Sequence, residues 1–345
     1  DTRVANAIIK SGKADMVAMG RQSIADPETP NKAAAGCFAD IRTCVGCLHG
    51  CDANVNLEQS GTCELNPIIG HESEAEYQTV MTDSPKNVLV IGAGPAGLEA
   101  AIGAAKRGHR VSVYDKDRWA GGKYRLASVP PCKGELGAFI VWQMHELKKL
   151  NVPVILNTVV TKELVDSVKP DVIIAATGTT PVVPRKIPGW DKDIVVLGTD
   201  VLSGKANTGH NVVVIGGGHA GAETANHIAS YMKNVTIVEL QEDIAMDEVD
   251  TPRNALLADL EKNKVRVCAS TSVSEIKDHS VVVSGKFNEE IECDTVVISI
   301  GHTPNTTLAD ELIQAGYDVR IIGDAVKVGL VGPAVRAGYL TARQI

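Results

Sequence analysis

The segment Val88–Gly97 has the sequence VLVIGAGPAG, and a close copy, VVVIGGGHAG, occupies Val212–Gly221. The first glycines of the two copies lie 124 residues apart. Each copy joins an apolar run, typical of a buried strand, to a glycine-rich turn and the start of a helical segment. From Asn87 onward, short Val/Ile strands alternate with helical segments. This pattern predicts an α/β chain with two Rossmann-like nucleotide-binding domains.

The first copy contains Gly92-x-Gly94-x-x-Gly97, here called the first fingerprint, and Asp115 ends the next predicted strand. In such a motif Gly92 permits a tight turn, Gly94 lets the backbone approach a diphosphate, and Gly97 allows the helix to pack closely. The helix N-terminus would supply N–H donors to the phosphates. Asp115 would accept hydrogen bonds from the adenosine ribose. The alternative is an ordinary glycine turn, but the placed strand, helix and acid favour a dinucleotide site.

The second fingerprint is Gly216-x-Gly218-x-x-Gly221. Glu239 follows its first glycine by 23 residues, the same interval that separates Gly92 from Asp115. It predicts a second nucleotide site, although a duplicated domain can keep its fold after losing its ligand. No Lys or Arg precedes Arg253 in the acidic stretch beyond Glu239, so a 2′-phosphate would be repelled and NADH is expected in preference to NADPH. A solvated acidic loop is the other interpretation. The acids are Glu242, Asp243, Asp247, Glu248 and Asp250.

Four of the eight cysteines form the cluster Cys44-x2-Cys47-x3-Cys51-x11-Cys63. Such a cluster indicates a metal site in a reducing compartment rather than a disulfide scaffold. Four thiolates suit either tetrahedral zinc or a 4Fe-4S cluster, and the spacing alone favours neither. Beside two nucleotide sites, an electron carrier is the more useful occupant.

The other cysteines argue against thiol–disulfide chemistry. Disulfide reductases with two nucleotide sites place a close cysteine pair beside the flavin. Cys132, Cys268 and Cys293 are isolated, and neither nucleotide domain contains a CxxC motif.

Length and charge set broader limits. A chain of 345 residues with 34 Lys plus Arg against 42 Asp plus Glu has a net charge of −8 and few aromatic residues. Nucleic acid is therefore not an expected partner. No secretory leader is visible, and glycines interrupt the most apolar window, Asn87–Ala105. We expect a soluble, cytoplasmic protein without a membrane span.

The predicted organisation has four parts. A helix over Val4–Ser11, a short buried strand over Asp15–Met19 and a turn at Gly20-Arg21 form one αβ unit, which cannot bury its own apolar faces. Because the chain begins with Asp1, we expect either a piece of a longer protein or a partner that completes this end. A β meander is expected between Ser272 and Ile300. The parts are residues 1–36, a Cys-rich segment and linker at 37–82, one nucleotide domain at 83–190 with 301–345, and the other at 191–300.

Taken in order, these features resemble the C-terminal part of the iron–sulfur flavoenzymes that include 2,4-dienoyl-CoA reductase, clostridial-type enoate reductases, and trimethylamine and histamine dehydrogenases. The resemblance covers nearly the whole chain. Gly12–Pro27 resembles the last strand and phosphate loop of the family's FMN-binding (β/α)8 barrel, which implies that Gly20 and Arg21 hold the FMN phosphate. The cysteine spacing and the following Asn66-Pro67 match the family's 4Fe-4S segment, so Cys44, Cys47, Cys51 and Cys63 would be the ligands.

The same resemblance assigns 83–190 with 301–345 to FAD and 191–300 to NAD(H). Gly121-Gly122, Ala176-Thr177-Gly178 and Gly323-Asp324 fall where the family contacts FAD. The sequence departs from the family at Lys123, where Gln is common, and at His219. About seven of the barrel's eight strand–helix units are absent, so no catalytic acid can be named.

The resemblance implies an electron-input module that carries electrons from NADH through FAD and a 4Fe-4S cluster to FMN. The substrate would be a small molecule with an activated C=C bond, such as an enoate or dienoyl-CoA. The barrel would belong to the same protein or to a separate subunit. The chain could also form a homo-oligomer. One alternative is an amine dehydrogenase of the trimethylamine or histamine type that delivers electrons to a partner protein. Others are a non-catalytic subunit that docks with a barrel protein, and a region stapled by zinc.

Overall fold

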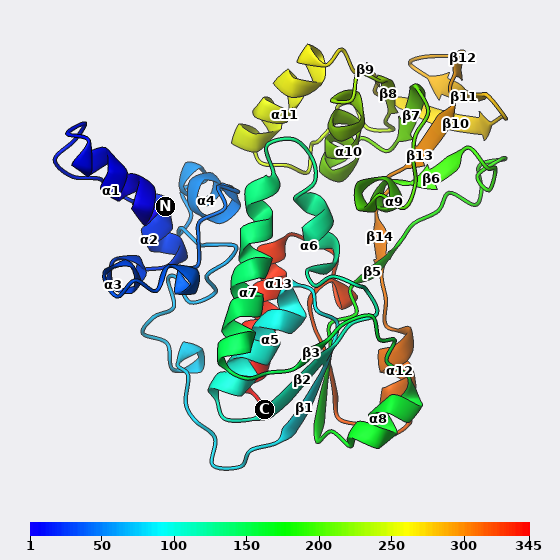
Figure 1. Ribbon diagram of the computed structural model, residues 1–345. Coiled ribbons are helices and arrows are strands. Elements are labelled where there is room, and N and C mark those ends of the chain that lie inside the picture. Colours follow the sequence, from blue (N-terminus) through cyan, green and yellow to red (C-terminus); the bar gives the residue numbers. More distant parts are fainter. The chain divides into compact units, whose positions relative to one another are not determined.

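A computed structural model describes all 345 residues, and its contacts divide the chain into two compact units (Figure 1). Each unit is formed by segments that are distant in the sequence. Unit 1 consists of Asp1–Arg125, Glu135–Thr179 and Pro304–Ile345, and unit 2 consists of Leu126–Gly134 and Thr180–Thr303. No helix is both long enough and apolar enough to cross a lipid bilayer.

Unit 1 is built on a parallel five-stranded sheet with the strand order β15-β4-β1-β2-β3. The central strand β1 is flanked on both sides, so Val88 lies opposite Val111 of β2 and Val172 of β4. Burial on both faces explains its continuous apolar sequence. The strands are β1 (Asn87–Ile91), β2 (Arg110–Tyr114), β3 (Val154–Ile155), β4 (Val172–Ala175) and β15 (Val319–Ile321).

Helices α5 and α13 of unit 1 approach each other closely, because a Cβ atom at Gly338 would lie 2.3 Å from the carbonyl oxygen of Ala96. Only glycine permits that separation. The helices of this unit are α1 (Thr2–Lys10), α2 (Gly20–Ala25), α3 (Thr29–Ala34), α4 (Asn54–Asn56), α5 (Pro95–Lys106), α6 (Gly122–Ala127, which runs on into unit 2), α7 (Gly137–Lys149), α8 (Lys162–Val168), α12 (Thr307–Gln314) and α13 (Val331–Arg343).

The N-terminal prediction is partly wrong. Asp15–Met19 does not form a buried strand, and Met16 is 81% exposed. No other strand of the chain pairs with this segment, and an unpaired strand has no hydrogen-bond ladder to stabilise it. Gly20 and Arg21 do not form a turn but begin helix α2.

The linker predicted at the end of residues 37–82 is anchored at Tyr77. Tyr77 is buried, and its carbonyl oxygen accepts a hydrogen bond of 2.6 Å from the hydroxyl of Tyr339 on α13. The rings of these two tyrosines also stack, with centroids 5.9 Å apart. The segment that follows the cysteines is therefore held to unit 1 by a specific contact.

Unit 2 repeats the same plan with a parallel sheet in the order β6-β13-β7-β8-β9. The predicted meander is confirmed as the antiparallel strands β10, β11 and β12, and the strand after it returns to the parallel sheet. The strands are β6 (Val195–Leu197), β7 (Asn211–Ile215), β8 (Asn234–Val238), β9 (Arg266–Cys268), β10 (Thr271–Ile276), β11 (Ser280–Gly285), β12 (Glu289–Glu292) and β13 (Thr295–Ile298). The helices are α9 (Gly198–Ser203), α10 (His219–Ala229) and α11 (Asp250–Lys262).

The chain passes between the two units four times, and at two of these passages β5 (Thr179–Pro181) pairs with β14 (His302–Pro304). In each unit the central strand leads directly into a glycine turn and a helix. Gly92 donates its N–H to the carbonyl oxygen of Tyr114 at 2.8 Å, and Gly216 donates to Val238 at 3.0 Å. Both glycine turns therefore lie at the carboxyl edge of a parallel sheet, where ligands of such folds bind.

Candidate functional site

The first fingerprint has the geometry that its glycines predict. Gly92 has a φ of +109°, and a Cβ atom there would lie 2.2 Å from the carbonyl oxygen of Ala176. A Cβ atom at Gly97 would lie 2.0 Å from the carbonyl oxygen of Gly92. At Gly94, by contrast, no atom lies within 4 Å of the Cβ position, and no side chain caps α5. Two glycines are thus required by the protein itself, while the third faces open space suited to a diphosphate.

Asp115 lies beside this turn at the end of β2. One carboxylate oxygen accepts the N–H of Ala93 at 2.6 Å, and the other accepts the N–H of Asp117 at 2.7 Å. Burial raises the pKa of the carboxyl group, against the effect of these two hydrogen bonds. Each oxygen retains a lone pair that can accept from a ribose hydroxyl.

Two further predicted FAD loops meet the first fingerprint. Gly121 donates its N–H to the carbonyl oxygen of Ala93 at 2.7 Å, and a Cβ atom at Gly122 would lie 3.6 Å from the Cα atom of Gly94. Gly323, with a φ of +64°, lies against Ala96, since its Cβ position is 2.9 Å from the Ala96 Cβ atom. Chain segments more than 200 residues apart in sequence therefore converge on one turn.

The other three residues predicted to contact FAD have protein partners. The hydroxyl of Thr177 donates to the carbonyl oxygen of Asn305 at 2.6 Å, and the carbonyl oxygen of Gly178 accepts the N–H of Asn305 at 2.9 Å. Asp324 forms an ion pair of 2.9 Å with Lys123. The lysine that departs from the family pattern thus supplies the counter-charge of a predicted cofactor-binding carboxylate.

The second fingerprint repeats the steric pattern of the first. A Cβ atom at Gly216 would lie 2.3 Å from the carbonyl oxygen of Ser299, and one at Gly221 would lie 2.1 Å from the carbonyl oxygen of Gly216. The Glu239 carboxylate accepts the N–H of Gly217, as Asp115 accepts that of Ala93. Gly218 differs from Gly94, because its Cβ position lies 3.5 Å from a carboxylate oxygen of Asp247.

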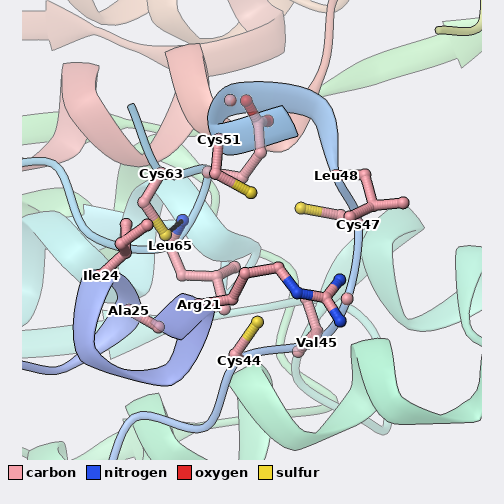
Figure 2. Close-up of a pocket in the computed structure, with 13 residues that line it drawn as sticks. Arg21, Ile24, Ala25, Cys44, Val45, Cys47, Leu48, Cys51, Cys63 and Leu65 are labelled. Carbon is pink, nitrogen blue, oxygen red and sulfur yellow. Dashed lines mark hydrogen bonds between the residues drawn. The ribbon is translucent and has the colours of Figure 1, made fainter. Parts of the chain in front are cut away.

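The four clustered cysteines line a single cavity, together with Arg21, Ile24 and Leu65 (Figure 2). Burial raises the pKa of the Cys51 and Cys63 thiols. No three His, Cys, Asp or Glu side chains are arranged to hold a metal ion. The four thiols thus share one cavity.

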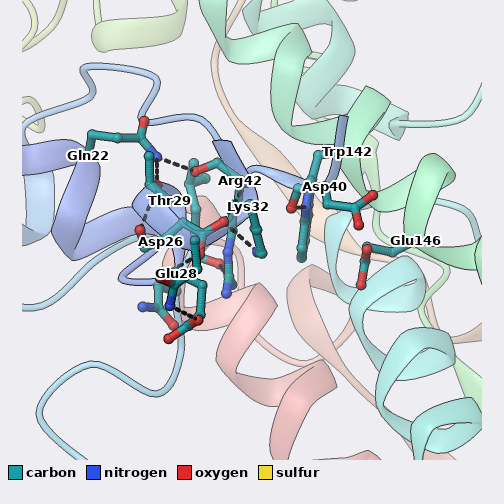
Figure 3. Close-up of polar contacts among 12 residues, drawn as sticks. Gln22, Asp26, Glu28, Thr29, Lys32, Asp40, Arg42, Trp142 and Glu146 are labelled. Carbon is teal, nitrogen blue, oxygen red and sulfur yellow. Dashed lines mark hydrogen bonds and ion pairs between the residues drawn. The ribbon is translucent and has the colours of Figure 1, made fainter. Parts of the chain in front are cut away.

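Helix α2 supports the start of the cysteine loop through Gln22, which is buried (Figure 3). Its side-chain oxygen accepts the N–H of Cys44 at 2.9 Å, and its amide nitrogen donates to the carbonyl oxygen of Arg42 at 3.1 Å. Asp26 accepts the N–H of Arg42 at 2.9 Å and pairs with Lys32 at 2.7 Å. The loop geometry therefore depends on residues about 20 positions earlier.

A second set of contacts fixes the same region to helix α7 (Figure 3). The guanidinium of Arg42 lies 4.7 Å from the Trp142 ring centroid, and the indole N–H of Trp142 donates to the carbonyl oxygen of Asp40 at 3.0 Å. Hydrogen bonds from Lys149 and His145, each 2.7 Å long, lower the pKa of the Asp40 carboxyl. His145 thus contributes to a structural contact.

Tyr124 is a residue that the sequence analysis did not identify. It follows Gly121-Gly122 on α6, and its hydroxyl is buried without a hydrogen-bond partner. It packs against the same hydrophobic core of unit 1 as Cys47 and Cys63 do. Burial, followed by the charges of Cys47 and Glu64, raises its pKa. A protonated donor is therefore close enough to Cys47 to be affected by its charge, and no sequence motif marks it.

Known proteins share this architecture. The pyridine nucleotide-disulphide oxidoreductase family matches residues 86–323, which implies FAD and NAD(H) binding. An NADH oxidase of Thermoanaerobacter brockii is 40% identical over 99% of this chain and 53% of its own length. A cinnamate reductase of Clostridium sporogenes is 36% identical over 100% of the chain and 52% of its own length.

Among solved structures, a 2-naphthoyl-CoA reductase is 32% identical, with a TM-score of 0.97 over 100% of this chain and 53% of its own. The chain thus spans about half the length of each of these oxidoreductases. Both fingerprints lie within the residues that the family model matches. The chain belongs to the pyridine nucleotide-disulphide oxidoreductase family and corresponds to the C-terminal part of the enoate and dienoyl-CoA reductases.

Proposed function

We propose that this chain is the electron-input part of an iron–sulfur flavoprotein reductase. NADH would bind at the second fingerprint, FAD at the first, and a 4Fe-4S cluster at the four cysteines. Electrons would then reach FMN in a barrel, in the same protein or in a partner subunit, and reduce a small molecule with an activated C=C bond. The observation that carries the proposal is that the four cysteines line one cavity in the unit that contains the first fingerprint.

The residues at the first fingerprint are suited to binding FAD. When bound, FAD supplies an acceptor for a hydride that can also release electrons singly, as a one-electron cluster requires. The open space at Gly94 would admit the diphosphate, and the uncapped start of α5 would favour its negative charge. Asp115 would orient the ribose, and the Lys123–Asp324 pair would lie toward the ribityl chain.

The cysteine cavity would offer an iron–sulfur cluster four thiol donors. The buried Tyr124 hydroxyl has no protein acceptor, and a cluster sulfur would provide one. The proposed ligands are Cys44, Cys47, Cys51 and Cys63.

For FMN, the proposal relies on Gly20 and Arg21 at the start of α2. No atom lies within 4 Å of the Gly20 Cβ position, so its backbone is accessible to a phosphate. Arg21 lines the cysteine cavity, which supports a role between the cluster and an FMN phosphate.

One observation favours a second candidate, an amine dehydrogenase in which electrons leave to a partner protein. The Asp247 carboxylate lies at Gly218, where an NADH diphosphate would bind. In an amine dehydrogenase that site would not need to admit NADH.

Mixing the FAD-loaded protein anaerobically with a pyridine nucleotide tests the main proposal and the choice between NADH and NADPH. We expect NADH to bleach the flavin absorbance several-fold faster than equal NADPH at low concentration. The two nearby basic groups are engaged: Lys233 donates to the Thr208 hydroxyl at 2.7 Å, and Arg253 pairs with Asp243 at 2.6 Å. Faster reduction by NADPH would contradict the assigned specificity. The second candidate would be favoured if neither nucleotide reduced the flavin and an amine reduced the cluster once a barrel was supplied.

The Tyr124→Phe variant tests whether the hydroxyl donates to a cluster. Hydrogen bonds to cluster sulfurs stabilise the reduced form, so their loss makes the midpoint potential more negative. One neutral hydrogen bond contributes about 1 kcal/mol, or about 40 mV for one electron. A redox titration followed by electron paramagnetic resonance should detect this shift. Tyr114→Phe, another tyrosine of unit 1, is the control, and equal potentials in both variants would show that the Tyr124 hydroxyl does not reach the cluster.

A further inference from the structure

The two fingerprints differ at the place where a dinucleotide diphosphate would bind. At the first, the space next to Gly94 is open. At the second, the N–H of His219, the first residue of α10, donates to one oxygen of Asp247 at 2.7 Å. The other oxygen contacts Nδ1 of the His219 ring at 2.6 Å. A carboxylate of the chain itself thus occupies the helix N-terminus that would receive the diphosphate.

The segment that carries Asp247 is fixed on the fingerprint at one end. Ile244 and Ala245 are buried, and the N–H of Ala245 donates to the carbonyl oxygen of Gly217 at 2.7 Å. Arg253 holds the preceding turn through the carbonyl oxygen of Ile244 at 3.0 Å. The far end is more accessible to solvent, since the Asp247 side chain is 54% exposed.

Ala245 turns the segment back toward α10 in a strained conformation. Its φ is +51°, in the left-handed region that costs a residue with a Cβ atom free energy. This turn brings Asp247 to His219, although the two residues are 28 positions apart. An ordinary helix cap comes from the residue next to the first turn and needs no such excursion.

We propose that Asp247, held by His219, occupies the place of the dinucleotide diphosphate and must be displaced before NADH binds. This inference rests on the proposed function of the second fingerprint. Here the His219–Asp247 pair is called the latch. The latch makes nucleotide binding a competition between two anions for the same N–H group and imidazole, so NADH binds more weakly than the site would otherwise allow.

Charges around the latch support an ion pair at neutral pH. The hydrogen bond to Asp247 raises the pKa of His219, with smaller contributions from Glu223 and Glu248. Burial acts to raise the pKa of Asp247, but His219 lowers it to about 2. Glu223 is itself paired with Lys133, which leaves Asp247 as the main partner of the imidazole. The ion pair is present above a pH of about 2 and is lost as the pH rises through the raised pKa of His219.

The test compares ADP binding to the FAD-loaded wild type and its Asp247→Ala variant by isothermal titration calorimetry. ADP carries the diphosphate but cannot reduce the flavin. Removing the competing carboxylate should tighten ADP binding about tenfold, the scale of a charged hydrogen bond at a helix N-terminus. Asp247→Asn, which keeps the shape but not the charge, should give a smaller gain. Glu261→Gln on α11 removes one negative charge elsewhere and should leave the affinity unchanged.

Unchanged or weaker ADP binding by Asp247→Ala would overturn the latch and leave Asp247 as a structural cap. If neither protein binds ADP, the latch is likewise overturned, because there is then no site for which Asp247 competes. A second measurement is independent of nucleotide: the pKa of His219, followed by NMR, should fall in Asp247→Ala. A pKa that does not change would show that the pair does not form. The proposed function is judged separately, by whether NADH reduces the flavin of the wild type.

Discussion

A Gly94→Val variant is expected to fold much as the wild type does and to bind FAD about a hundredfold more weakly. Its backbone conformation, with φ −77° and ψ 173°, is open to valine, and no protein atom lies within 4 Å of a Cβ atom at this position. The isopropyl group would instead fill the space proposed for the diphosphate, and overpacking of this kind costs about 1–3 kcal/mol. Valine is also a poor N-cap residue, so the free energy of unfolding should fall by about 1 kcal/mol. Flavin content after denaturation and thermal unfolding followed by circular dichroism measure the two effects.

Two further glycine variants make this result specific. Gly134→Val is the control, because Gly134 also faces open space without a left-handed φ, and it should retain FAD. Gly97→Val should fail differently, by unfolding, since its side chain would meet the carbonyl oxygen of Gly92. A Gly94→Val protein with full FAD content would show that the first fingerprint is not the diphosphate site.

Cys51→Ala should abolish the iron–sulfur cluster while FAD remains bound. Cys51 lies in the single π-helical turn His49–Ala53, and its thiol points into the cysteine cavity (Figure 2). The wild type, purified anaerobically, should contain about four iron and four sulfide per chain. The variant should lose nearly all of both. FAD should stay because none of the contacts described at the first fingerprint involves this turn.

The control for this experiment lies in the same segment. Cys37 is exposed and does not line the cavity, so Cys37→Ala should keep its iron, sulfide and electron paramagnetic resonance signal. Metal analysis of the wild type gives the decisive contrary result. Stoichiometric zinc without iron would mean that the cysteines hold a structural metal ion rather than an electron-transfer cluster.

The nucleotide-binding architecture follows from short stretches of sequence. Val88–Gly97 and Val212–Gly221 each contain the strand, the turn and the helix start, and the glycines act on atoms close by. Gly97 meets the carbonyl oxygen of Gly92 only five residues earlier, and Gly221 meets Gly216 in the same way. Because these constraints are local and steric, the pattern of residues determines the turn before the rest of the chain is considered.

The sequence also predicts a strand at Asp15–Met19 that the structure does not contain. A strand needs a neighbour, and whether one exists is a property of the fold rather than of the five residues. The apolar pattern there is compatible with a strand in a barrel. In this structure it belongs to a loop with an exposed Met16.

The residues that distinguish the two sites were determined only by tertiary structure. Tyr124 has no motif, and it packs against the same core as Cys47 and Cys63, which lie some 60–80 residues earlier in the sequence. In the sequence, Asp247 is one of several acids in an acidic stretch. In the structure, the left-handed turn at Ala245 places its carboxylate at the start of α10. Composition and spacing predict which ligands the chain would bind, because glycine turns and thiols are local chemistry. Which groups compete with those ligands or contact them depends on long-range packing, and no local pattern encodes it.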